Sequence, residues 1–372
     1  MKTLIALSTT LLTILPLGLS APADTSSENP RRRTDLSTRI IEQGNAPWSL
    51  QRISSVAPVT QNGRPATDMT YKYRYDERDN ASGVDVYVLD GGVNMLHPDF
   101  GGRAKVIFAA NRADLWDNNG HGTHVAGIIG SLHYGVAKNA SIFALRIDSN
   151  PPLDAPSGGY DTPPPEHIND IVAAMLTVVQ QHNYRKKTNK DFKGSVMNLS
   201  WGFPPVYMDM VPNGHMILKA ALKNATDAGI HITIAPDNSN SDACNHFPSG
   251  YVQDLPTLFV VGSSDIMDRR ANNSDWGSCI DIHAPGVDIM STSIPQLGDA
   301  VANSGTSMAA PLVAGVIATQ LAKYPDLRLN PAEMKKHILG MAQKWVVKGA
   351  EKGGNFLLNT GMGENPMEAF VN

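Results

Sequence analysis

The chain has 372 residues, of which 42% are hydrophobic, and its formal net charge is −4. A chain of this length can bury a deep apolar core, so one large globular domain with targeting segments is expected. The mildly acidic charge gives no basis for nucleic-acid binding.

Residues 1–20 have the pattern of a secretory signal peptide that is cleaved after Ser20. Lys2 precedes an apolar run over residues 4–19, which threonines and a proline interrupt. A membrane anchor is the alternative, but this run is too short to span, and no later stretch reaches about 20 apolar residues. We therefore expect a protein that is secreted, or delivered to a vacuole or similar compartment, and has no membrane association after cleavage.

Residues 21–42 form a polar stretch that cannot bury enough apolar surface to fold alone. We interpret it as a short pro-segment. The arginines at 31–33 are either a processing site for a proprotein convertase or a solvated charge run. A folded domain over residues 43–360 and a C-terminal tail over 361–372 complete the expected organisation.

Short apolar runs alternate with helical patterns from about residue 45 onward, which predicts an α/β fold with a mostly parallel sheet between helices. The expected strands cover residues 84–89, 141–147, 194–200, 230–235 and 258–261. The expected helices cover residues 168–182, 216–228 and 309–324. Residues 148–165 are rich in proline, which cannot donate to a sheet, so a surface loop is expected there.

Three side chains suited to serine catalysis stand in small-residue settings far apart in the sequence. Asp90 follows the strand at 84–89, His121 lies in Gly-His-Gly-Thr-His, and Ser307 lies in Gly-Thr-Ser-Met-Ala. We expect Asp90 to orient the imidazole, His121 to act as the base, and Ser307 to be a nucleophile at a helix start. His121 and His124 also have the spacing of a metal-binding pair, but the glutamate of the zinc-protease motif is absent.

These motifs resemble those of the subtilisin family, and within it the proteinase K and cerevisin branch. The resemblance runs from residue 43 to 359 and rests on the segments 117–127, 134–137, 242–245, 281–286 and 304–311. The chain order Asp, His, Ser agrees with this family and differs from that of α/β-hydrolases and chymotrypsin-like proteases. The resemblance implies a subtilisin-like three-layer sandwich and a monomeric serine endopeptidase that needs no cofactor for catalysis and acts on polypeptides.

The resemblance also assigns roles around the expected nucleophile. Asn238 matches the side chain that donates to the oxyanion. Ser200, Trp201 and Gly202 match the segment that pairs with an extended substrate. Asp237 stands where the family has a glycine in the primary specificity pocket, which suggests a preference for Lys or Arg before the cleaved bond.

Two structural sites follow from the same resemblance. Cys244 and Cys279 match a disulfide of cerevisin-like members, and two free buried thiols are the alternative. Asp281, with the carbonyls of Pro256 and Leu258, matches a structural calcium site, because calcium favours carboxylate and carbonyl oxygens. A lone structural aspartate is the alternative there.

The chain departs from the family pattern in ways that leave two other functions open. Gly91 replaces the Thr or Ser that usually follows the acid, and residues 21–42 are shorter than a folded inhibitory prosegment. A catalytically weak or inactive peptide-binding protein is therefore one alternative, and a maturation protease of narrow specificity is another. Four sequons are expected to accept glycans in an exported chain, at Asn80, Asn139, Asn224 and Asn272.

Overall fold

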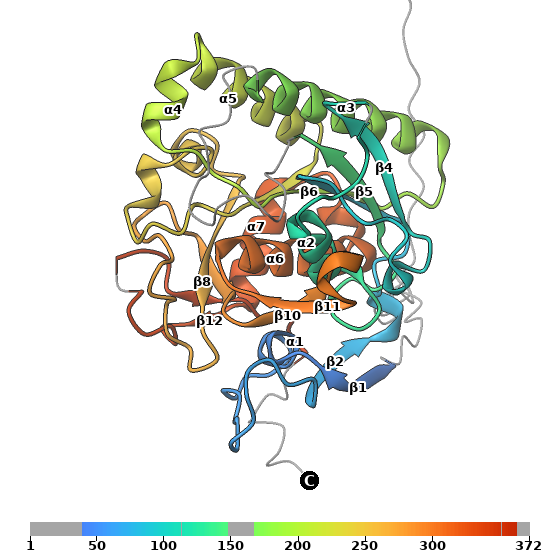
Figure 1. Cartoon of the computed structure of the whole chain (residues 1–372), viewed down its shortest axis with the longest axis vertical. Helices are drawn as coiled ribbons and strands as arrows, with labels where there is room; N and C mark the ends of the chain where they lie inside the picture. Colours follow the sequence, from blue (N-terminus) through green and yellow to red (C-terminus); the bar gives the residue numbers. More distant parts are fainter. Residues whose placement is uncertain (1–38, 113, 148–166, 351, 363–372) are drawn as a thin grey trace, which may run out of the picture. The chain divides into compact units, whose positions relative to one another are not determined.

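The computed structural model describes residues 39–112, 114–147, 167–350 and 352–362 (Figure 1). The expected signal peptide, most of the expected pro-segment, the proline-rich segment and residues 363–372 lie outside the described residues. Within the described ranges, no helix has both the length and the apolar character of a membrane span.

The described residues contain a nine-stranded sheet whose neighbouring strands are parallel except for one pair at its edge. In spatial order the strands are β12 (Gln343–Lys344), β13 (Phe356–Leu357), β9 (Ile282–Pro285), β8 (Phe259–Ser264), β7 (His231–Ile234), β6 (Gly194–Leu199), β3 (Val84–Asp90), β5 (Ser141–Arg146) and β4 (Ala104–Ala109). The antiparallel pair is β12 with β13. This sheet carries all five strands that the hydrophobic pattern predicts, with no end shifted by more than three residues.

Two hairpins lie outside this sheet. One joins β10 (Ile289–Thr292) to β11 (Ala300–Asn303), and the other joins β1 (Ile40–Ala46) to β2 (Tyr71–Asp76). Because β1 begins at Ile40, the last three residues of the expected pro-segment are part of a paired strand.

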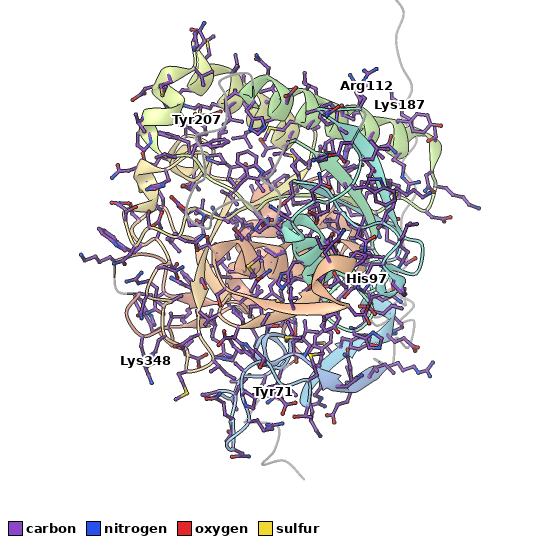
Figure 2. All side chains as sticks on the ribbon, in the orientation of Figure 1. Tyr71, His97, Arg112, Lys187, Tyr207 and Lys348 are labelled. Carbon is purple, nitrogen blue, oxygen red and sulfur yellow. A yellow bond between two sulfur atoms is a disulfide. The ribbon has the colours of Figure 1, made fainter. Side chains whose placement is uncertain are left out.

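Helices cover both faces of the sheet, as expected for the three-layer fold (Figure 1). The helices are α1 (Trp48–Ile53), α2 (His121–Gly130), α3 (His167–Thr188), α4 (Pro205–Met210), α5 (Gly214–Asp227), α6 (Thr306–Lys323) and α7 (Pro331–Met341). α2 and α6 pack on one face and α3 and α5 on the other, each with its own apolar cluster, and side chains fill the space between the helices and the sheet (Figure 2). Alternate residues of β3 serve the two clusters: Val86 faces α2 and α6, whereas Tyr87 faces α3 and α5.

The predicted disulfide is present between Cys244 and Cys279, which are 35 positions apart. The alternative of two free thiols is therefore excluded. A cross-link that closes a loop of this length stabilises the fold by about 3–4 kcal/mol in the chain-entropy estimate.

Candidate active site

The sheet order brings the expected site residues together along the carboxyl ends of the strands, which form one edge of the sheet. β7, β6 and β3 are adjacent parallel strands, so their carboxyl ends lie side by side. Asp90 is the last residue of β3, Ser200 follows β6, and Asn238 follows β7. In α/β sheets this edge is where ligands usually bind.

Asp90 and His121 form a hydrogen-bonded pair at this edge. The Nδ1 atom of His121 lies 2.9 Å from Oδ1 and 3.0 Å from Oδ2 of Asp90. The backbone N–H of Gly91 donates to Oδ1 of Asp90 at 2.8 Å, so the main chain supplies a donor that the missing Thr or Ser would offer. A Cβ on Gly122 would lie 2.0 Å from the carbonyl oxygen of Gly92, so only glycine permits this approach of α2 to β3.

Asp117 holds the first turn of α2, on which His121 sits. Its Oδ1 accepts from the N–H of Gly120 at 2.8 Å, and its Oδ2 accepts from the N–H and hydroxyl of Thr123 at 2.8 and 2.6 Å. The sequence did not indicate this role, because the capping signal concerns the residue immediately before a helix, which is Gly120 here.

Burial alone would lower the pKa of His121, but the charge of Asp90, its hydrogen bond and the charge of Asp117 outweigh burial, so the pKa is raised above 6.5. A general base must be neutral, so we expect kcat/KM to rise with pH, with its midpoint above 6.5. Asp117→Asn removes one of these charges and should move the midpoint to lower pH. Hydrolysis of a chromogenic peptide between about pH 5 and pH 9 measures both values. A wild-type midpoint at or below 6.5 would contradict this assignment.

His124 has a structural role and does not form a metal pair with His121. Its Nε2 lies 2.9 Å from the carbonyl oxygen of Ile289, which joins α2 to β10. Burial lowers the pKa of His124 to about 4, so its ring is neutral at ordinary pH.

Ser307 lies in the first turn of α6 and is bound reciprocally to Ser200. The hydroxyl of Ser307 donates to the carbonyl of Ser200, and the hydroxyl of Ser200 donates to the carbonyl of Ser307, both at 3.0 Å. Pro311, four residues later, has no N–H to offer that carbonyl, so the Ser200 hydroxyl does not share it with a helical hydrogen bond from that position. The Ser307 hydroxyl donates its hydrogen bond to Ser200. Within the part of the chain that the structure describes, no hydrogen bond joins it to His121.

A buried chain of hydrogen bonds supports Ser200 from the sheet. The side-chain amide of Asn198 donates to the Ser200 hydroxyl at 2.8 Å, and the hydroxyl of Thr233 donates to the Asn198 carbonyl oxygen at 2.9 Å. This chain links β7, β6 and α6. Asn198 is also the first residue of a fifth sequon, Asn-Leu-Ser, and its side chain is fully buried.

The amide of Asn238 is oriented by the start of α6. Its Oδ1 accepts from the N–H of Thr306 at 2.8 Å and from the Thr306 hydroxyl at 3.3 Å. The NH₂ end of the amide is therefore directed away from Thr306. A Cβ on Gly305 would lie 3.2 Å from Oδ1 and 3.4 Å from Nδ2, so a glycine leaves room for this side chain.

The family model described as "Subtilase family" matches residues 81–363. The chain belongs to the subtilase family. The sequence is 37% identical over 316 residues to "Subtilisin-like protease 3" of Saccharomyces cerevisiae, covering 82% of this chain and 59% of that protein. It is 35% identical over 350 residues to "Cerevisin" of the same organism, covering 90% of this chain and 50% of that protein.

A solved structure agrees with the fold. "Crystal structure of a cold adapted subtilisin-like serine proteinase" superimposes with a TM-score of 0.66 at 33% identity, over 85% of this chain and 98% of that one. The subtilase described here spans only half to three fifths of the length of the two yeast relatives.

The segment that the resemblance assigns to substrate pairing follows β6 at the site's edge. The indole N–H of Trp201 donates to the carbonyl of Leu89 at 2.9 Å, which fastens the segment to β3. A Cβ on Gly202 would lie 2.1 Å from the carbonyl oxygen of Pro236, so a side chain cannot be accommodated there.

The carboxylate of Asp237 already has partners within this subtilase. Its Oδ1 accepts from the N–H of Asn238 at 2.7 Å, and its Oδ2 lies 3.1 Å from Nδ1 of His246. A carboxylate with a resident cationic partner attracts a basic substrate side chain less strongly, so the pairing weighs against the expected preference for Lys or Arg.

A lysine occupies the position where calcium was expected. The ammonium of Lys335, on α7, lies 2.8 Å from Oδ1 of Asp281 and donates to the carbonyl of Leu258 at 2.5 Å. Oδ2 of Asp281 accepts from the N–H of Val260 at 2.9 Å. The set of Asp281, Pro256 and Leu258 therefore does not fit a calcium ion, because a cation of this chain already neutralises the carboxylate.

The four expected glycan acceptors differ in accessibility. Asn139, Asn224 and Asn272 are exposed, whereas Asn80 is half-buried and its Oδ1 accepts from the N–H of Ser82 at 3.2 Å. Glycosylation at all four stays a prediction.

Proposed function

We propose that this subtilase is a secreted serine endopeptidase in which Asp90, His121 and Ser307 hydrolyse peptide bonds. The observation that carries the proposal is the hydrogen-bonded pair of Asp90 and His121. Because Nδ1 of His121 faces the carboxylate, Nε2 is the nitrogen left to accept a proton.

In the proposed reaction the Ser307 hydroxyl leaves the carbonyl of Ser200 and turns toward His121. Its proton passes to Nε2 as the oxygen attacks the substrate carbonyl, and Asp90 stabilises the imidazolium. His121 then protonates the leaving amine, and the acyl group remains on Ser307. A water molecule, deprotonated by His121, releases the acid and restores the hydroxyl. No step requires a metal or cofactor.

The proposed oxyanion site consists of the Asn238 amide and the N–H of Ser307. The first N–H groups of a helix lack partners within it, and the helix dipole there favours negative charge. The Thr306 contacts support the role of Asn238, since they fix the carbonyl end of its amide and leave the NH₂ end to donate.

A fluorophosphonate probe tests the proposal on the purified full chain. An activated Ser307 should react and gain the probe's mass in its tryptic peptide, and the protein should cleave unfolded casein. A folded protein that neither reacts nor cleaves would support the peptide-binding alternative instead. Labelling without casein cleavage would favour a protease of narrow specificity.

Replacing Asn238 with alanine should lower kcat by about 10²- to 10³-fold with little change in KM, the range found when this donor is removed from subtilisin. The loss is confined to kcat because the oxyanion forms only in the transition state. Asn240→Gly, in the same loop, is the matched control, since its positive φ of 51° suits glycine. Equal effects of the two changes on kcat would refute the role of Asn238.

Export is proposed from residues 1–20, and N-terminal sequencing of protein recovered from culture medium tests it. The mature N-terminus should follow either Ser20 or the arginines at 31–33. We also propose that the protein is a monomer. At Asp281 we propose that no calcium is bound, because Lys335 supplies the positive charge there.

A further inference from the structure

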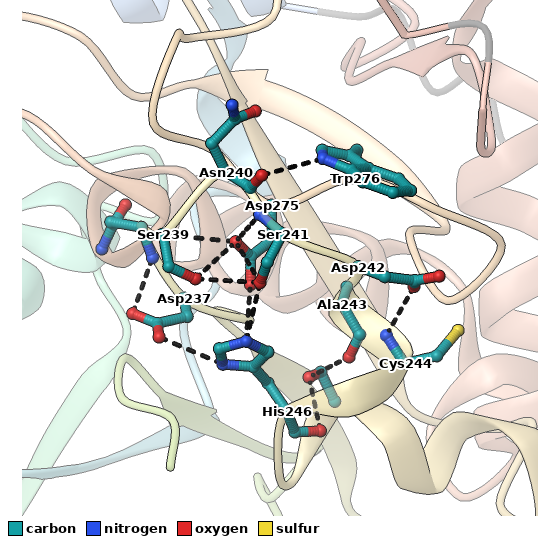
Figure 3. Close-up of polar contacts among 12 residues, drawn as sticks. Asp237, Ser239, Asn240, Ser241, Asp242, Ala243, Cys244, His246, Asp275 and Trp276 are labelled. Carbon is teal, nitrogen blue, oxygen red and sulfur yellow. Dashed lines mark hydrogen bonds and ion pairs between the residues drawn. The ribbon is translucent and has the colours of Figure 1, made fainter. Parts of the chain in front are cut away.

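His246 lies between two carboxylates in the loop that follows β7 (Figure 3). Its Nδ1 lies 3.1 Å from Oδ2 of Asp237, and its Nε2 lies 3.8 Å from Oδ2 of Asp275. The hydroxyl of Ser241 also contacts Nε2, at 2.7 Å. The imidazole is 10% exposed, so water screens these contacts only weakly.

Asp275 is the buried end of this cluster. Its Oδ1 accepts from the N–H groups and hydroxyls of Ser239 and Ser241, at distances between 2.9 and 3.3 Å. Its Oδ2 has no hydrogen-bond partner among the described residues, and the residue is fully buried. The protonated form of His246, whose Nε2 lies 3.8 Å from this oxygen, places a positive charge beside the buried side chain.

Asp237 connects this cluster to the oxyanion amide. Its Oδ1 accepts from the N–H of Asn238, and its carbonyl accepts from the hydroxyl of Thr306 at 3.3 Å. Thr306 in turn donates its N–H to Oδ1 of Asn238. The backbone of Asn238 is thus held by Asp237, and its side chain by α6.

The three side chains Asp237, His246 and Asp275 offer metal-ligating atoms within 4.8 Å of one another. The two ring nitrogens of His246 face different carboxylates, however, so the ring fills the space between the oxygens that a single ion would join. A doubly protonated ring places its positive charge near both carboxylates in the observed orientation, 3.1 Å from Asp237 and 3.8 Å from Asp275.

We propose that the imidazolium of His246 is a positioning residue for catalysis, which holds Asp237 and, through it, the oxyanion donor Asn238. This inference rests on the proposed function, in which Asn238 stabilises the transition state. His246 does not touch the substrate. Its role is to fix the segment that presents the donor.

The charges of three carboxylates act on the ring, those of Asp275, Asp237 and Asp242. The hydrogen bond of Asp237 raises the pKa of His246, burial opposes it, and the charges of the three carboxylates add to the rise above 6.5. Burial would raise the pKa of Asp237, but His246 and the N–H of Asn238 outweigh burial and lower it below 3.8. The ion pair therefore persists from acidic pH until the pH rises through the raised pKa of His246.

The test is the pH dependence of kcat for three purified full-length variants. In the wild type, kcat should fall as the pH rises through the pKa of His246. His246→Gln should lower kcat by about 10- to 100-fold with KM little changed, and should lose this alkaline fall, because misplaced catalytic groups reduce the rate at equal binding. His337→Gln is the matched control, since His337 is a half-buried histidine on α7 with a side-chain partner, Gln320.

Asp237→Asn keeps the side-chain volume and leaves Asp275 intact, so it carries the test should His246→Gln fail to fold. It should lower kcat and move the alkaline fall to lower pH, because His246 loses its nearest carboxylate. Variants that retain wild-type kcat and the wild-type alkaline limb would overturn the inference while the proposed function stands. A folded wild type that does not react with fluorophosphonate would overturn both.

Discussion

Replacing Ser307 with alanine is expected to lower kcat by about 10⁶-fold, the loss known for the same change in subtilisin itself. The reason is that the alanine variant has no atom to form the acyl-enzyme, and the members of such a triad act as a unit. The measurement is hydrolysis of a peptide substrate by enzyme at equal, verified concentration. Fluorophosphonate labelling should disappear in the same variant.

Ser304→Ala is the matched control for Ser307→Ala. Ser304 lies three residues earlier, and its hydroxyl accepts from the N–H of Asp288 at 2.9 Å, outside the proposed machinery. This control should keep kcat within a few-fold of wild type. A Ser307→Ala variant that is as active as the control would show that another residue is the nucleophile.

Replacing Lys335 with alanine is expected to produce the largest loss of stability. The change leaves Asp281, whose side chain is 17% exposed, without its cation. Removing one partner of a fully buried pair costs about 3–5 kcal/mol in the free energy of unfolding, so a loss at the lower end of that range is expected. Burial already raises the pKa of Asp281, and Lys335 offsets that effect only in part. Denaturant unfolding followed by circular dichroism measures the loss.

Adding or removing calcium tests whether Lys335 replaces the ion or only lies near its site. Added calcium or chelator should leave the unfolding of the wild type unchanged, whereas calcium should restore part of the stability of Lys335→Ala, whose carboxylate and carbonyls become available. Lys336→Met is the control, because Lys336 is exposed and its pair with Glu333 is worth less than about 1 kcal/mol. Wild-type protein that loses stability in chelator would contradict the assignment.

Local pattern predicted the frame of the site and not its inner contacts. The alternation of apolar residues predicted the strand that ends at Asp90, short glycine-containing motifs indicated His121 and Ser307, and the resemblance assigned Asn238. The contact of Lys335 with Asp281 joins α7 to a residue beside β9, and no pattern within either segment reports it. Lys335 is evident in the sequence, but which carboxylate it contacts depends on the packing of the whole chain.

Sequence patterns also do not predict the hydrogen bonds of backbone groups or the contacts of side chains that belong to no motif. Gly91 suggested a missing donor to Asp90, yet its N–H donates to that carboxylate, because the turn after β3 directs it there. His246 and Asp275 stand nearly thirty positions apart, so their proximity follows from the loop that Ser239 and Ser241 close around the carboxylate. The contacts of Asp117 with the first turn of α2 were not predicted either, because Asp117 lies three positions before the N-cap residue Gly120.

We expect Pro311 to limit how far the stability of this protein can be raised without lowering kcat. A designer would replace a proline inside α6 with alanine, a better helix former. The N–H of the new alanine, however, would compete with the Ser200 hydroxyl for the carbonyl of Ser307. This competition would weaken the reciprocal hydrogen bonds that join Ser307 on α6 to Ser200 after β6. A more stable helix would then position the proposed nucleophile Ser307 less well, so we expect stability and turnover to be opposed at this one residue.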